Sequence, residues 1–124
     1  MKIEVITTGD EVLSGQIVDT NFAWIADQLW TRGFDLVWHT TVADDPERIG
    51  EALKAAAQRS DVVVVTGGLG PTSDDITLEA AARAFKLPLE LNKEALGEIK
   101  DLFKKIGREM TPNNERQAML PRGA

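Results

Sequence analysis

The sequence predicts an α/β protein in which a mostly parallel sheet lies between two layers of helices. Runs of β-branched residues alternate along the chain with segments of helical periodicity, which is the pattern of strands joined by crossover helices. Such connections are right-handed and place successive strands in parallel. Residues 62–65 are four consecutive valines. A run without any polar residue is expected of a strand that is buried on both faces. With 124 residues and 43% hydrophobic content, the chain suits a single domain over residues 1–124.

Two strands and a helix are predicted in the first third of the chain. Residues 3–7 form the first strand, and the segment 7–16, "TTGDEVLSGQ", is a predicted polar loop. Apolar residues then recur at helical spacing at Phe22, Ile25, Ala26 and Leu29. We expect this helix to have Asp19 or Thr20 as its N-cap and to end at Gly33. Residues 34–42, "FDLVWHTTV", form the second strand.

A second helix and the third strand follow. Asp45 is the expected N-cap of the helix, with Pro46 at its first position. The buried stripe of this helix is expected at Ile49, Leu53, Ala56 and Ala57. Residues 62–65 form the third strand, and Thr77 is the expected cap of a helix that runs to about Lys86.

The last third of the chain is predicted to contain less regular structure. Residues 87–91, "LPLEL", form a short extended piece, and a longer helix then ends at Gly107. The apolar positions of that helix are Leu96, Ile99, Phe103 and Ile106. A capped helical turn is expected around residues 115–119. Because another strand would normally follow, we expect the domain to be truncated at its C-terminus.

The composition excludes several classes of protein. The formal net charge is −6 and the charges are scattered, which disfavours binding to nucleic acid or to an anionic membrane. There is no cysteine, and hence no disulfide or thiolate metal site. Neither a signal peptide nor a membrane-spanning run is present. We therefore expect a soluble cytoplasmic protein that binds a small molecule, with no nucleic acid and no membrane as partner.

The segment 62–75, "VVVVTGGLGPTSDD", is the strongest candidate for a binding site. In open α/β sheets, ligands bind at the carboxyl ends of the strands, where backbone N–H groups are free to meet anions. Gly67, Gly68 and Gly70 allow the backbone to approach a phosphate closely, and Pro71 stiffens the turn. A tight turn without a ligand is the alternative interpretation of the same glycines.

Carboxylates follow all three predicted strands at the same edge. Asp10, Glu11, Asp44 and Asp75 are expected to gather there around a phosphate. Since carboxylates repel an anion unless a metal ion bridges them to it, this pattern indicates metal-assisted phosphoryl or pyrophosphate chemistry.

Several carboxylates in these loops also have an interpretation without a ligand. Asp74 and Asp75 can be favourable charges at the start of a helix. Asp45 is better explained as the cap that precedes Pro46. Asp10 and Glu11 can be ordinary turn residues. The functional interpretation is preferred because the carboxylates converge on one edge of the sheet.

Five further residues stand outside this pattern. His39, the one histidine of the chain, is expected to be structural because it lies within a strand. Arg116 and Arg122 can contact phosphate, but a solvated surface position is the commoner role of such arginines. Trp24 falls on the polar face of the first helix and is expected to form a subunit contact. Together with Trp30, it suggests a homodimer or homotrimer.

Four stretches carry a resemblance to a known family. They are "TTGDEVLSGQIVDTN" at 7–21, "TVADDPERI" at 41–49, "VVVTGGLGPTSDDIT" at 63–77 and "GREMTPNNERQAMLP" at 107–121. They resemble the N-terminal domain of the CinA competence/damage-inducible family. The resemblance implies the molybdopterin-binding fold of the MogA, MoaB and MoeA proteins, a three-layer α/β/α sandwich.

The resemblance also implies an activity and a set of site residues. The implied reaction is hydrolysis of ADP-ribose to AMP and ribose 5-phosphate, with Mg²⁺, Mn²⁺ or Co²⁺ as cofactor. Asp75 and Asp44 are the implied catalytic residues, and with Asp74 they are the implied metal ligands. The implied substrate-binding residues are Gly9, Asp10, Glu11, Asn21, Thr66, Gly67, Gly68, Gly70, Pro71, Thr72 and Thr77. Many CinA proteins carry threonine where this chain has Asp10.

The sequence leaves two other possibilities open. The same loop in a binding module would hold a molybdopterin or nucleotide without hydrolysing it, because one fold hosts both uses. Alternatively, the chain is inactive because residues beyond Ala124 complete the site.

Overall fold

The central strand of the sheet is β1, which lies between two parallel neighbours. The computed structural model describes residues 1–124 and has the strand order β2-β1-β3, with β1 at Lys2–Thr8, β2 at Asp35–Val42 and β3 at Val62–Thr66. Thr7 is opposite Thr41 on one side and opposite Thr66 on the other. The carboxyl ends of the three strands therefore lie together, as the sequence predicted.

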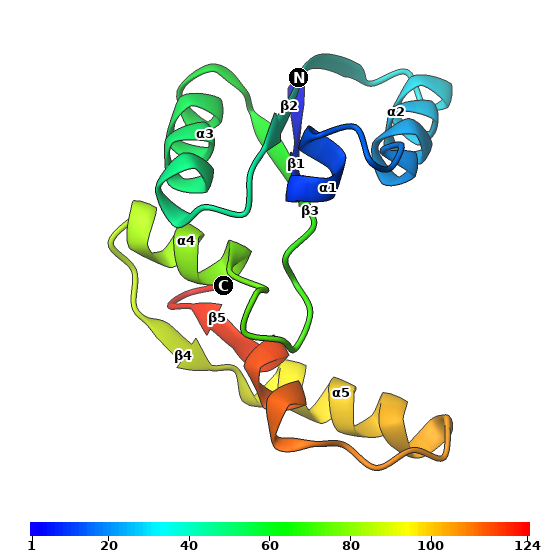
Figure 1. Ribbon diagram of the computed structural model, residues 1–124, viewed down its shortest axis with the longest axis vertical. Helices are drawn as coiled ribbons and strands as arrows, with labels where there is room; N and C mark the ends of the chain where they lie inside the picture. The colour runs from blue at the N-terminus through cyan, green and yellow to red at the C-terminus, as the bar shows by residue number, and fades with distance from the viewer.

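Helices cover both faces of this sheet (Figure 1), which confirms the layered α/β fold. On one side is α2 (Thr20–Thr31) and on the other is α3 (Pro46–Arg59). The predicted caps of both helices are confirmed, because Asp19 accepts a hydrogen bond from the amide of Phe22 at 2.8 Å and Asp45 accepts one from Arg48 at 2.9 Å. The loop predicted after β1 contains a short helix, α1 (Asp10–Leu13), because the segment bonds its own backbone from Leu13 to Gly9.

The core lies between β1, α3 and α4 (Thr77–Ala84). Its buried residues are Ile6, Ile49, Leu53, Ala56 and Ala80. Helix α4 packs closely on α3, since a Cβ placed on Gly50 would stand 3.4 Å from the Cβ of Ala84. The prediction that Ala57 belongs to the buried stripe was wrong, and Ala57 is exposed because it is one position round the helix from buried Ala56.

The valine-rich strand β3 was predicted to be buried on both faces, and this prediction was wrong, because the buried strand is β1. Residues 3–8 are all buried, whereas β3 is an edge strand of the described sheet and its Val62 is 39% exposed. The valines correctly predicted a strand. Its position in the sheet depends on tertiary pairing, which the local pattern does not contain.

Residues 89–121 form an arm that extends away from the sheet (Figure 1). It comprises β4 (Leu89–Leu91), α5 (Lys93–Lys105), the 3₁₀ helix η1 (Pro112–Ala118) and β5 (Met119–Pro121). Strands β4 and β5 pair antiparallel. The sequence did not predict this pairing, because each strand has only three residues and shows no clear alternation of polar and apolar residues. Across the whole protein, no helix combines the length and apolar character needed to cross a bilayer.

A buried carboxylate fastens the end of β1 that is opposite the loops. The side chain of Glu4 is fully buried and accepts hydrogen bonds from Arg59 at 2.6 and 2.9 Å and from Ser60 at 3.1 Å. Thr40 adds a bond at 3.2 Å, and the Arg59 guanidinium lies 4.7 Å from the centre of the Trp38 ring. The hydrogen bond from Arg59 is the main reason that the pKa of Glu4 lies below its ordinary value. The charged form of Glu4 is therefore the one that the fold requires.

Replacing Glu4 with glutamine is expected to lower the free energy of unfolding by about 1–3 kcal/mol at neutral pH, because the amide leaves the surrounding donors unsatisfied. Since the folded-state pKa of Glu4 is depressed, its contribution is complete above the ordinary value of 4.5 and is lost as the pH falls through the folded-state value. Urea unfolding at neutral pH and at pH about 4 therefore shows a smaller difference between Glu4→Gln and the parent in acid.

The matched control is Glu90→Gln. Glu90 also pairs with an arginine, Arg122 at 2.6 Å, but its side chain is 49% exposed, so water replaces the lost bond. Equal destabilisation by both substitutions would contradict the role assigned to Glu4.

Candidate functional site

Buried threonine hydroxyls fix the loop that follows β3. The hydroxyl of Thr77 donates to the carbonyl of Gly67 at 2.8 Å and lies 3.3 Å from the hydroxyl of Thr8. The amide of Thr77 donates to the carbonyl of Gly68 at 3.2 Å. The prediction that Thr77 caps α4 was wrong: the cap position is Ile76, and the Thr77 side chain binds the loop instead. This hydroxyl therefore joins β1, the loop and the start of α4.

The loop glycines are required by close contacts within the protein. A Cβ on Gly67 would stand 2.3 Å from the carbonyl oxygen of Thr8, and one on Gly68 would stand 2.3 Å from the hydroxyl of Thr77. At Gly70 the clash would be with the Asp75 carboxylate, at 2.6 Å. From the sequence, these glycines were expected to allow the approach of a phosphate. The structure gives a different reason, which is that the loop packs directly on its neighbours.

Asp75 is held as a carboxylate by its own loop. One of its oxygens, Oδ2, accepts hydrogen bonds from the amide of Thr72 at 2.9 Å and from the hydroxyl of Thr72 at 2.7 Å. The bond from the Thr72 side chain is the main reason that the pKa of Asp75 is lowered, and the backbone of Gly70 and the charge of Arg116 act in the same direction. Asp75 is therefore ionised near neutral pH, and Thr72 orients it.

Asp10 and Asp44 form a reciprocal pair at the ends of β1 and β2. The amide of Asp10 donates to the Asp44 carboxylate at 3.2 Å, and the amide of Asp44 donates to the Asp10 carboxylate at 3.0 Å. The amide of Gly9 donates to the carbonyl of Val42 at 3.0 Å. These bonds bring the two loops together, as the sequence predicted. Asp45 is the helix cap that the alternative interpretation proposed.

The carboxylates do not form a ready-made metal cage. No three acidic or histidine side chains are close enough to one another to hold one ion, so Asp10, Glu11, Asp44 and Asp75 are not gathered as expected. Asp74 and Glu11 are exposed. Mg²⁺ nevertheless needs only one or two carboxylates when water and ligand phosphates supply the other oxygens. Ionised Asp75 fits that role, and the Asp10–Asp44 pair is a second candidate.

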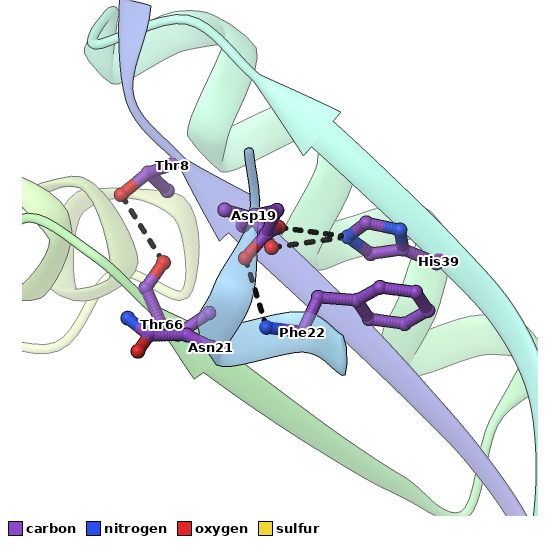
Figure 2. Close-up of polar contacts among 7 residues, drawn as sticks. Thr8, Asp19, Asn21, Phe22, His39 and Thr66 are labelled. Atoms are coloured by element: carbon purple, nitrogen blue, oxygen red, sulfur yellow. Dashed lines mark hydrogen bonds and ion pairs between the residues drawn. The ribbon is translucent and has the colours of Figure 1, made fainter. Parts of the chain in front are cut away.

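The start of α2 is attached to the sheet beside the same edge (Figure 2). The amide group of Asn21 donates to the hydroxyl of Thr66 at 3.3 Å, so Asn21 contacts the last residue of β3. Nε2 of His39 lies 3.0 Å from the Thr7 hydroxyl and 3.5 Å from Asp19, and the Phe22 ring stacks on His39 at 3.5 Å. These contacts give His39 a packing role between α2 and β1.

The pKa of His39 reflects opposing influences. Partial burial lowers it, and the neighbouring Asp19 carboxylate acts in the opposite direction with a smaller effect. One oxygen of that carboxylate, Oδ2, is buried without a hydrogen-bond partner. His39 and Asp19 therefore position the first turn of α2, and with it Asn21.

A cleft of about 110 Å³ separates the glycine loop from the arm. Its lining residues are Gly68, Leu69, Gly70, Asp75, Leu78, Glu79, Leu89, Arg116 and Met119. Arg116 comes from η1 in the arm, whereas Arg122 is occupied by its ion pair with Glu90. A surface position was the preferred prediction for both arginines, with a phosphate contact as the alternative, because nothing in the local pattern distinguishes the one that lines the cleft.

The chain is similar to proteins of known family. A family model described as a probable molybdopterin binding domain matches residues 4–122. A CinA-like protein of Anaeromyxobacter sp. is 48% identical over 124 residues, which are 100% of this chain and 30% of that protein. A putative competence-damage inducible protein of Bacillus subtilis is 45% identical over 99% of this chain and 30% of its own length. The chain thus spans 30% of the length of these relatives.

Solved structures show the same similarity. The crystal structure of CinA from Thermoplasma acidophilum, a protein of unknown function, superposes with a TM-score of 0.85 and 38% identity, covering 98% of this chain and 70% of that one. The tungsten cofactor synthesizing protein MoaB from Pyrococcus furiosus gives a TM-score of 0.65 and 30% identity, covering 86% of this chain and 64% of that one. The predicted family and fold are therefore confirmed.

Replacing Gly67 with alanine is expected to destabilise the protein more than replacing Gly15. Both glycines have positive φ, 98° and 77°, but a Cβ on Gly67 meets the β1 backbone, whereas one on Gly15 meets nothing within 4 Å. Gly15→Ala is expected to cost about 1–2 kcal/mol for the backbone conformation alone, and Gly67→Ala adds a steric clash. Thermal unfolding followed by circular dichroism measures both. Similar losses would show that the loop moves away from Thr8 easily.

Proposed function

Because this chain belongs to the CinA family and consists of its probable molybdopterin-binding domain, we propose that it hydrolyses the pyrophosphate bond of ADP-ribose. The products are AMP and ribose 5-phosphate, and a divalent ion, Mg²⁺, Mn²⁺ or Co²⁺, takes part. The observation that carries the proposal is the ionised carboxylate of Asp75 within a glycine loop at the carboxyl edge of a parallel sheet. That combination suits a phosphate held together with a cation.

The backbone of the glycine loop supplies donors for the phosphate. The amides of Gly68 and Leu69 donate no hydrogen bond to another backbone group, and both residues line the cleft. Unsatisfied amides in a turn form an anion-binding concavity. Thr77 holds these amides in place through its bonds to the carbonyls of Gly67 and Gly68, so little reorganisation is needed when a ligand binds.

Asp75 is better suited to bind a cation or orient water than to remove a proton. Its lowered pKa makes it a weak base, and general-base catalysis is most effective when the pKa lies near the working pH. A divalent ion held by this carboxylate would neutralise charge on the phosphates of the ligand and would lower the pKa of a water molecule bound to the ion. The Asp44 carboxylate, fixed by the amide of Asp10, is the second group proposed to assist at this edge.

The alternative is a module that binds a molybdopterin or a nucleotide without hydrolysing it. The relatives with solved structures include MoaB, described as a tungsten cofactor synthesizing protein, which supports a pterin phosphate as ligand. Leu69, Leu78 and Met119 line the cleft and suit the flat ring of either ligand. Release of products distinguishes the two functions, since the module would bind stoichiometrically.

Asp75→Asn is expected to reduce release of AMP from ADP-ribose by about 100-fold or more, because the amide carries no charge for a cation. The assay compares the parent and the variant with Mg²⁺, Mn²⁺ or Co²⁺ and again with a chelator. Asp101→Asn is the matched control, since Asp101 is exposed on α5, outside the cleft. Full activity of Asp75→Asn, or activity unaffected by the chelator, would refute the proposal. Binding of ADP-ribose without products would support the module.

We also propose that the protein forms a homodimer or homotrimer through the exposed tryptophans of α2. Trp24 and Trp30 are 65% and 82% exposed on this helix, and exposed tryptophans are enriched at interfaces. Light scattering is expected to give a mass above the 13.6 kDa of one chain, and the double variant Trp24→Ser with Trp30→Ser is expected to be monomeric. A monomeric parent at high concentration would contradict this.

A further inference from the structure

The cleft presents an electrostatic problem for an anionic ligand. Two of its lining residues, Asp75 and Glu79, are acidic, and Arg116 is its single basic residue. Free amides of the loop attract a phosphate, but the ionised Asp75 beside them repels it. A divalent ion would reduce this repulsion in part. A positively charged side chain in the cleft lining would reduce it further, and Arg116 provides such a charge.

Arg116 is available for a ligand. Arg59 and Arg122 are each bound to a glutamate at 2.6 Å, whereas Arg116 forms no ion pair and its residue is exposed. Arg116 and Asp75 line the same cleft, and no salt bridge joins them. The guanidinium is therefore not already neutralised by the carboxylate across the cleft.

The position of Arg116 is fixed by η1 and by the chain that follows. Thr111 and Asn114 form a capping box at the start of η1, and Ala118 at its end is buried. The carbonyl of Ala118 accepts a bond from the amide of Asn92 at 2.8 Å, next to the paired strands β4 and β5. The backbone that carries Arg116 is thus defined, while its side chain has freedom to meet a ligand.

We propose that Arg116 binds the phosphate of the ligand from the arm, opposite the free amides of Gly68 and Leu69, so that the anion joins the arm to the sheet. The guanidinium offers donors in a planar fork that matches phosphate oxygens. The inference rests on the proposed function only in taking a phosphate-bearing nucleotide or pterin as the ligand. It assigns the binding site to the cleft between two parts of the fold, and not to the loop edge alone.

The test measures binding of ADP-ribose by calorimetry to the parent chain and to Arg116→Gln, Arg116→Lys and Arg122→Gln. Losing a charge-assisted hydrogen bond is expected to weaken binding by Arg116→Gln about 10- to 100-fold. Arg116→Lys retains the positive charge but not the planar fork of donors, and its affinity for ADP-ribose is expected to lie between those of the parent and Arg116→Gln. Arg122→Gln is the matched control, because Arg122 is bound to Glu90 outside the cleft, and its affinity is expected to equal that of the parent.

Two further readouts separate phosphate binding from a structural effect. Added KCl is expected to weaken binding less in Arg116→Gln than in the parent, because one charge contact is gone. Adenosine, which lacks phosphate, is expected to bind the parent and Arg116→Gln alike. Loss of adenosine binding together with a lowered melting temperature would indicate a structural role and overturn the inference.

The possible failures are distinguishable. If the parent binds ADP-ribose and Arg116→Gln binds it equally well, the inference is wrong and the proposed function stands. If the parent binds neither ADP-ribose nor inorganic pyrophosphate, both are wrong. If Arg116→Gln loses affinity while the parent releases no AMP, the inference holds and the non-hydrolytic module is favoured over the pyrophosphatase.

Discussion

The packing of Gly67 against the carbonyl of Thr8 is the contact on which the candidate site depends. It turns the chain sharply at the end of β3, where any Cβ would stand 2.3 Å from that oxygen. Because of this turn, the Gly67 carbonyl meets the Thr77 hydroxyl at 2.8 Å, and the amides of Gly68 and Leu69 remain without backbone partners. The first part of the loop therefore binds its neighbours through the carbonyls of Gly67 and Gly68 and keeps the amides of Gly68 and Leu69 free, which is the arrangement that an anion site needs.

The second property of the site is the separation of its charges. The Thr72 bonds stabilise the Asp75 carboxylate and lower its pKa, so the cleft that the free amides line also carries a negative group. Within hydrogen-bonding range of a phosphate, such a charge is unfavourable unless a cation is shared or an opposite charge is near. The carboxylate of Asp75 and the guanidinium of Arg116 line one cleft, and an ion or a phosphate between them would experience both charges.

The sequence predicted those features that local chemistry determines. The caps at Asp19 and Asp45 follow from side-chain bonds to amides three residues on, and the strand that becomes β1 follows from its β-branched run. Features set by tertiary contact were missed. The same threonine chemistry that allows a cap at Thr77 instead bonds the loop, and the valines of β3 lie at an edge. Arg116 cannot be distinguished from other surface arginines in the sequence, because its role depends on the position of the arm beside the loop. Long-range pairing, including β4 with β5, leaves no periodic signal in short segments.

The distribution of buried residues separates a firmly held part of the molecule from a loosely held one. Strand β1 is buried along residues 3–8 and has the Glu4 network at one end and the threonines of the site at the other. The arm, by contrast, buries only Ala118, and segments with few buried apolar contacts open at low free-energy cost. A phosphate held by both the loop amides and Arg116 would therefore add its binding free energy to the attachment of this sparsely buried arm. Binding and ordering of the arm are then linked, because the ligand would contact the arm through the one cleft residue that carries a positive charge.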